Sequence, residues 1–246
     1  MDREDDFMLY GWICWGEKEA LERTEILNAP FLKVTLYQGR AEALTRRRVR
    51  QAGRKLRKLG ITQVVLPGNF PYREFLEKEG VFPVGTLSLR SEIAADWVRA
   101  ALAGKGMAPS GVKVAVTAEN LTAEVVRTVT ELSLRHRFVA LSVPRGGEEL
   151  GRRLRREYGV SLGLDSGAVE RAEAVVEFTR GEKAGSLLTL RIWDETQPLP
   201  ELLLPPGQEE ALPADADRGQ LIAALRRSGA VKQVSVAAAE GMISGT

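Results

Sequence analysis

Two short segments of the chain carry the residues with the strongest case for binding chemistry. Thr117 and Asn120 follow one apolar run that is typical of a strand, and Arg145, Gly146 and Gly147 follow a second. Both segments lead into helical patterns, so these residues are expected near the first turn of a helix. An arginine beside exposed helix-start amides can hold a phosphate or a carboxylate. The pattern predicts a site for a small anionic ligand.

The glycine pair also has a simpler interpretation. Gly146 and Gly147 can merely turn the chain, while Glu148 and Glu149 satisfy the positive end of the helix dipole. Acids that already occupy this end would compete with any anionic ligand. The sequence leaves both interpretations open.

The loop from Thr117 to Thr122 lacks the glycines of a dinucleotide-binding turn. Its side chains would hold a pyrophosphate away from the backbone, and Glu119 would repel it. No GxxxxGK[ST] segment occurs in the chain. We therefore expect neither nicotinamide nor flavin dinucleotides to bind, and we predict no cofactor.

A second candidate surface is a basic helix over residues 41–59, whose expected apolar stripe includes Leu44 and Leu59. Residues 41–60 carry eight basic side chains and only one acid, Glu42. Clustered cations can bind the phosphates of a nucleic acid, or an acidic protein, without reading sequence. The alternative is a solvated helix neutralised by the acidic N-terminal segment or by the acidic arm at 194–217. The cations proposed for polyanion binding are Arg46, Arg47, Arg50 and Arg54.

Residue types that usually perform catalysis are scarce. Cys14 lies in an apolar run and is expected in the core, and His136 is expected at a solvated helix end between two arginines. The acidic pairs lie in the proline-rich arm at 194–217, where no rigid element spaces them. The sequence predicts no catalytic residue and no metal site, although an enzyme of unrecognised type stays a third possibility.

The elements that must position these residues alternate between strand and helix. After residue 109, strands are expected at 112–116, 138–143 and 160–162, with helices at 121–135 and 147–158 between them. Such successive units favour a parallel sheet with helices on both faces. The predicted fold class is α/β, with a Rossmann-like second part.

The chain is expected to divide in two at the glycine-rich segment 104–111. Residues 1–108 would form an N-terminal α/β unit whose first strand is expected at 8–15. Residues 109–246 would form the Rossmann-like unit, with a helix starting at Ser91 just before it and a strand at 231–236 extending its sheet. The segment 194–217, with five prolines, seven acids and no basic residue, is expected to form an extended arm anchored by its leucines.

In strand and helix order, the second part is similar to the nucleotide-binding half of shikimate-dehydrogenase-like proteins. The resemblance implies a Rossmann-like sheet. It carries no diagnostic motif, so no residue or activity is transferred from it.

The composition restricts the cellular compartment in which the protein is expected. The single cysteine excludes an intramolecular disulfide, and the acidic N-terminus is unlike that of a signal peptide. No apolar run is long enough to span a membrane. We expect a soluble, cytoplasmic protein of bacterial type, with no membrane partner.

Overall fold

The computed structural model describes residues 10–39, 41–108, 110–181 and 186–237. The chain divides into two compact units, and both are discontinuous in sequence. Unit 1 comprises residues 1–86 and 204–233, and unit 2 comprises residues 87–203 and 234–246. The division falls after Thr86, whereas the sequence places it at the glycine-rich segment 104–111, which here follows a helix inside unit 2.

Unit 1 is built on a five-stranded sheet in the order β2-β3-β1-β4-β5. β2 and β3 form an antiparallel hairpin, and the other neighbouring pairs are parallel. Leu27 and Asn28, both at positive φ, make the two-residue turn of this hairpin. The strands are Tyr10–Gly16 (β1), Ala20–Ile26 (β2), Ala29–Tyr37 (β3), Gln63–Val65 (β4) and Phe82–Pro83 (β5). Met8, where the first strand was expected to begin, lies outside the described residues.

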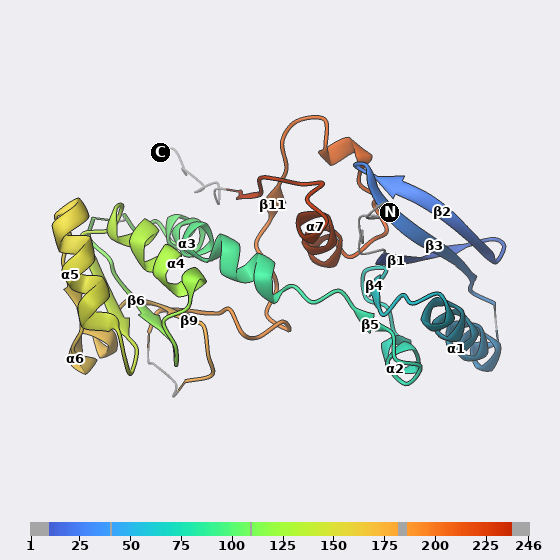
Figure 1. Ribbon diagram of the computed structural model, residues 1–246, viewed down its shortest axis with the longest axis horizontal. Coiled ribbons are helices and arrows are strands. Elements are labelled where there is room, and N and C mark those ends of the chain that lie inside the picture. The colour runs from blue at the N-terminus through green and yellow to red at the C-terminus, as the bar shows by residue number, and fades with distance from the viewer. Residues whose placement is uncertain (1–9, 40, 109, 182–185, 238–246) are drawn as a thin grey trace, which may run out of the picture. The chain divides into compact units, whose positions relative to one another are not determined.

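Helices α1 (Glu42–Lys58) and α2 (Arg73–Glu77) lie together on one face of this sheet (Figure 1). The predicted stripe of α1 is only partly buried. Its inner positions join the core, whereas Leu44 and Leu59 are 51% and 57% exposed. The residues that share this core include Ile13, Val34, Val49, Ala52, Leu56, Val64 and Leu76.

The C-terminal part of the chain returns to unit 1 and closes it. A short 3-10 turn (Glu209–Ala211) precedes helix α7 (Arg218–Arg227), which packs beside β4. Asp217 caps α7 by accepting from the Gln220 amide at 2.9 Å. The Gln220 side chain then accepts from the buried backbone amide of Leu66 at 3.0 Å. The sequence placed this helix in the second domain, and the structure places it in unit 1.

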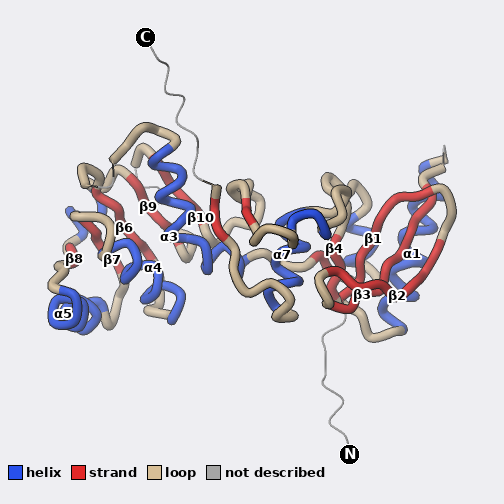
Figure 2. The backbone as a smooth tube through the Cα atoms, turned by 90° about the horizontal axis from the view of Figure 1, so that it is seen from above, coloured by secondary structure: helices blue, strands red, loops and turns tan. Residues whose placement is uncertain are grey.

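Unit 2 contains a fully parallel sheet in the order β10-β9-β6-β7-β8. If these five strands are numbered 1 to 5 along the chain, their spatial order starting from β8 is 3-2-1-4-5, which is the doubly wound arrangement. Figure 2 shows these strands side by side. The strands are Lys113–Thr117 (β6), Phe138–Ser142 (β7), Leu162–Gly163 (β8), Ala174–Glu177 (β9) and Leu188–Arg191 (β10). The predicted α/β class with a Rossmann-like second part is confirmed.

Helices cover both faces of this sheet (Figure 1). Right-handed crossovers place the β6–β7 and β7–β8 connections on one face, and the return from β8 to β9 on the other. On that other face, α6 packs Ala168 and Val169 against Ala115, Ala140 and Val175. The helices are α3 (Leu87–Ala103), α4 (Ala123–Ser133), α5 (Gly147–Tyr158) and α6 (Ser166–Glu170).

Two predicted elements differ in unit 2. Helix α3 starts at Leu87, so Ser91 lies inside it and is buried rather than capping it. The expected strand at 231–236 is reduced to β12 (Ser235–Val236), which pairs antiparallel with β11 (Leu202–Leu203) and does not extend the large sheet. Leu202 is buried at 2% exposure, so the acidic arm is anchored there, whereas Leu203 is 42% exposed.

Candidate functional site

The carboxyl ends of four neighbouring strands in unit 2 form a polar row. Thr117 pairs in register with Ser142 on β7 and with Glu177 on β9, and Glu177 pairs with Arg191 on β10. Residues paired across parallel strands point to the same face. The chain order reverses between β6 and β9, so Thr117 lies at the topological switch point, where doubly wound sheets bind ligands.

The loop after β6 is closed by its own side chains. The Thr122 hydroxyl caps α4 by accepting from the Val125 amide at 3.4 Å. The Glu124 backbone amide and the Thr122 side chain hydrogen-bond the Glu124 carboxylate and hold its pKa below the ordinary value. The amide of Glu119 donates to the Thr179 hydroxyl at 3.1 Å. A dinucleotide fold binds pyrophosphate at this first turn of α4, but here the Thr122 hydroxyl and the Glu124 carboxylate already accept hydrogen bonds from its backbone amides.

The loop after β7 differs because α5 begins without a side-chain cap. Gly146 is the N-cap residue, and its φ of +83° is a conformation that favours glycine. A Cβ at Gly146 would lie 3.1 Å from the Leu121 side chain, so the two loops are in contact at this point. Gly147 is buried, whereas Arg145, Glu148 and Glu149 are exposed.

The structure places the five residues of the predicted anion site at one edge of the unit 2 sheet. Thr117 lies beside the β7 end, and the Ala118 amide donates to the Ser142 carbonyl at 3.1 Å. Leu121 joins the Thr117–Asn120 loop to Gly146. Asn120 and Arg145 are exposed at the tips of these loops. The five predicted residues thus lie at the end of β6, on the loops that follow β6 and β7, and at the start of α5.

Glu177 is a residue of this edge that sequence reasoning missed. It is 4% exposed, and its carboxylate lies 3.6 Å from the Arg191 guanidinium. A buried charge requires such a partner, and this pair joins the ends of β9 and β10. The available signal was an acid ending the apolar run Ala174–Val176.

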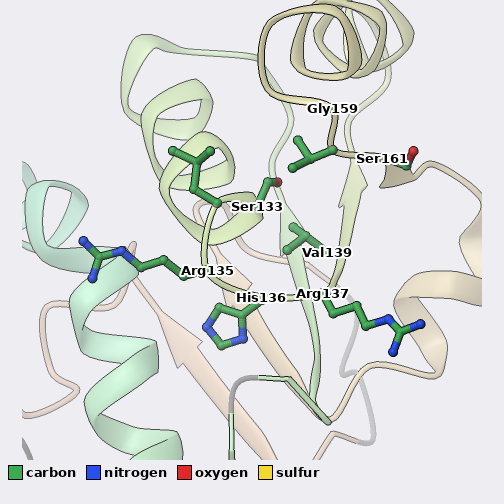
Figure 3. Close-up of a pocket in the computed structure, with 9 residues that line it drawn as sticks. Ser133, Arg135, His136, Arg137, Val139, Gly159 and Ser161 are labelled. Atoms are coloured by element: carbon green, nitrogen blue, oxygen red, sulfur yellow. The ribbon is translucent and has the colours of Figure 1, made fainter.

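A pocket of about 370 Å³ lies at the opposite, amino-terminal edge of the sheet. His136, expected to be solvated, is only 3% exposed, because its ring turns inward while the neighbouring arginines remain outside. Figure 3 shows Arg135 and Arg137 extending in opposite directions, with the His136 ring pointing away from Ser161. These side chains do not converge on one point, so the pocket offers no shared anion site.

On the basic helix, two of the four predicted cations have acidic partners. Arg46 pairs with Glu42 at 2.6 Å, and Arg54 pairs with Glu79 at 3.0 Å. Arg47 and Arg50 are exposed, and neither has an ion pair among the described residues. Among the described acids, the partners of this helix are Glu19, Glu42 and Glu79 rather than acids of the 194–217 arm. Glu19 belongs to the acidic N-terminal segment and pairs with Arg48 at 2.7 Å, whereas residues 1–9 of that segment lie outside the described residues.

Sequence reasoning also missed the aromatic partner of this helix. Phe75, from α2, has three cations over its ring: the Arg50 guanidinium at 4.8 Å, and Arg46 and Lys78 at 5.7 Å each. The ring comes from a different helix, as the third residue of α2, so inspection of residues 41–59 alone could not find it.

Cys14 is buried as expected, at 4% exposure. Burial raises the pKa of its thiol, and a weak hydrogen bond with Thr35 opposes that effect. In the described part of the chain, no group of three or more His, Cys, Asp or Glu side chains could hold a metal ion. No described helix is both long and apolar enough to cross a membrane.

Comparisons with known proteins give no family. No family model matches the sequence, and no curated protein matches it either. Among solved structures, the chain has 15% identity with L-tryptophan dehydrogenase from Nostoc punctiforme, covering 61% of this chain and 44% of that one, with a TM-score of 0.27. It therefore spans less than half of that enzyme.

Two further structures are similar at the same level. Shikimate 5-dehydrogenase from Listeria monocytogenes shares 11% identity, over 73% of this chain and 71% of that one, with a TM-score of 0.27. Shikimate dehydrogenase from Aquifex aeolicus shares 11% identity, over 72% and 70% of the two chains, with a TM-score of 0.26. Superpositions this loose carry no inference about activity, and the Rossmann-like assignment rests on the strand order of unit 2 itself.

Proposed function

We propose that unit 2 is a non-catalytic module that binds a small anionic ligand where α5 begins. Arg145 supplies the charge, and the backbone amides around Gly146 and Gly147 supply hydrogen-bond donors. Thr117 and Asn120 approach from the adjoining loop. The supporting observation is a contrast among the three helices α4, α5 and α6 that connect strands of the unit 2 sheet: Thr122 caps α4 and Asp165 caps α6, whereas α5 begins without a side-chain cap.

The same contrast argues against a dinucleotide. Pyrophosphate binding after β6 would require displacing Thr122 and the Glu124 carboxylate from the first turn of α4. Glu119 adds an exposed negative charge to that loop. The anion is therefore proposed at the neighbouring helix, and the ligand is a small phosphate or carboxylate compound.

Glu148 and Glu149 limit the affinity at this position. Both lie in the first turn of α5 and are exposed, so they compete electrostatically with an incoming anion. Arg145 must supply most of the attraction. Binding should consequently be sensitive to salt and to the loss of this one side chain.

The test is calorimetric titration of the full chain with inorganic phosphate and with citrate. Arg145→Gln should weaken binding about tenfold or more, because a charge-assisted hydrogen bond contributes roughly 1.5–3 kcal/mol. Arg137→Gln is the matched control: it removes another exposed arginine, which lies at the opposite edge of the same sheet. Equal effects of the two substitutions, or no binding by the unmodified protein, would contradict the proposal.

The enzyme alternative predicts a different outcome. A catalytic site would consume or convert its ligand, and its activity would depend on titratable side chains that converge on the bound molecule. A bound probe recovered unchanged after prolonged incubation supports a binding module, whereas turnover that is lost in Arg145→Gln would establish an enzyme.

A further inference from the structure

Helices α1 and α2 of unit 1 present a strongly basic surface. Between residues 42 and 79 the chain carries ten basic and four acidic side chains. The apolar side of α1 is buried against the sheet, so its arginines and lysines are displayed outward or toward α2. We define the basic strip as Arg46, Arg47, Arg50, Arg54, Arg57, Lys78 and Phe75.

The cations of the strip are ordered along the helix axis. Arg46, Arg50 and Arg54 follow one another at four-residue spacing, which advances about 6 Å per step. Lys78 enters from α2, and Arg57 lies against Gly80, where its guanidinium comes within 4 Å of a Cβ placed there. A linear row of like charges is suited to a linear polyanion rather than to one small ion.

Phe75 holds part of this row in place. The Arg50 guanidinium lies 4.8 Å from the ring centroid, and Arg46 and Lys78 approach the same ring. Phe75 itself is half-buried and packs on the core of unit 1. The ring is fixed by this packing, and its contact with Arg50 restricts the Arg50 side chain before any ligand binds. Binding therefore costs less conformational entropy at Arg50 than at a freely moving arginine.

Within the described residues, the acids of this region do not neutralise the strip. Glu42 forms an ion pair with Arg46, and Glu79 forms one with Arg54, while Arg47 and Arg50 have no acidic partner among the described residues. Like charges on adjacent turns repel one another, so this arrangement gains from a polyanion that separates and neutralises them.

We propose that the basic strip binds single-stranded nucleic acid without sequence preference, the arginines contacting phosphates and the Arg50–Phe75 pair accepting a stacked base. Nucleic acid is the partner whose chemistry matches both features, since its phosphates take the cations and its bases stack on aromatic rings or on guanidinium planes. An acidic protein or an anionic membrane would use the charge but would have no need of the ring.

The experiment measures fluorescence anisotropy of a labelled oligothymidylate with the full chain, between about 50 and 200 mM salt. The double substitution Arg47→Gln/Arg50→Gln should reduce the slope of log K against log salt by about 1.4, because each phosphate contact on a single strand contributes about 0.7. Arg47 supplies one such contact, and Arg50 supplies the other through the N–H edge of its guanidinium, whose face stacks on a base. The matched control is Arg152→Gln/Arg153→Gln on α5, which removes the same charge from unit 2. Its slope should remain that of the unmodified protein.

Phe75→Leu separates the ring from the charge, since it keeps an apolar side chain in the core of unit 1. It should weaken oligothymidylate binding about tenfold, and Phe75→Tyr should restore it. Thermal melting of each variant verifies that the fold is retained.

Three results would overturn the inference. The first is no binding at about 50 mM salt. The second is a control that loses as much as the strip variant. The third is binding to phosphatidylserine vesicles that depends on Arg47 and Arg50 but is indifferent to Phe75, which would assign the strip to a membrane surface. None of these outcomes bears on phosphate or citrate binding by unit 2.

Discussion

The hydrogen bond between Gln220 and Leu66 offers the sharpest test of how unit 1 is completed. Its two residues are 154 positions apart, and the Gln220 side chain accepts from the Leu66 amide at 3.0 Å. Leu66 is 3% exposed, so removing the acceptor leaves a buried amide unsatisfied. Loss of this hydrogen bond destabilises the fold by about 1–3 kcal/mol, and the higher helix propensity of alanine offsets only a few tenths of a kcal/mol. Gln220→Ala should therefore lower the free energy of unfolding of unit 1 by about 2 kcal/mol.

Urea denaturation followed by tryptophan fluorescence can measure this change. Trp12 and Trp15 belong to unit 1, whereas Trp97 and Trp193 belong to unit 2. In a Trp97→Phe/Trp193→Phe background, the remaining tryptophan fluorescence comes from unit 1. Gln51→Ala, on the exposed side of α1, is the control and should change stability by less than about 0.5 kcal/mol. Gln220→Glu should retain most of the stability because a carboxylate can still accept the bond. A Gln220→Ala cost no larger than that of the control would refute the proposed role of α7 in closing unit 1.

The local surroundings of Cys14, Gly146 and Glu209 each determine the effect of a substitution. Cys14 should react slowly with thiol reagents in the native protein, because it is buried and its pKa is raised by that burial, and Cys14→Ser should cost about 1 kcal/mol in a melting experiment. Gly146→Ala should destabilise more than Gly159→Ala: both glycines have positive φ, but only the first new methyl group would meet a side chain, at 3.1 Å. Hydrogen bonds from Arg218 lower the pKa of the Glu209 carboxyl in the folded protein. The stability that they contribute is therefore present above the unfolded pKa of this carboxyl and is lost as pH falls through the folded pKa. In melting curves taken between about pH 5 and 2, Arg218→Gln should reduce the loss of melting temperature on acidification.

Local sequence patterns predicted the elements of unit 2 well where their ends carried clear signals. Helix α5 runs over 147–158 as expected, because glycines in the left-handed conformation lie at both of its ends. The apolar runs of β6, β7 and β9 were recognisable for a similar reason, since strands covered on both faces consist almost wholly of aliphatic residues.

The incorrect or missed predictions have physical causes that a short stretch of sequence does not contain. β2 (Ala20–Ile26) was missed because it is a mostly exposed edge strand whose residues are largely polar. Helix α7 was assigned to the wrong part of the chain because the contacts that bind it to β4 join residues far apart in sequence. His136 was misplaced because the charges beside it remain exposed while its own ring is buried.

The candidate site was predictable only as a set of residues on two loops. The sequence indicated that Thr117 and Gly146 follow neighbouring strands, and parallel register places both at one edge of the sheet. It could not indicate which helix start is occupied, because that depends on Thr122 and Glu124 turning back onto α4. Nor could it reveal Phe75 beneath Arg50, a contact between two helices.

The central proposal, an anion bound at the start of α5, is tested most directly by an amide-resolved NMR titration of the full chain with inorganic phosphate. We expect saturable chemical-shift changes of the Gly146, Gly147 and Glu148 amides, and no change of the Thr122–Glu124 amides because α4 is already capped. In Arg145→Gln the same shifts should require about tenfold more phosphate. Shifts centred on Thr122–Glu124, or uniform small shifts with no saturation, would contradict it.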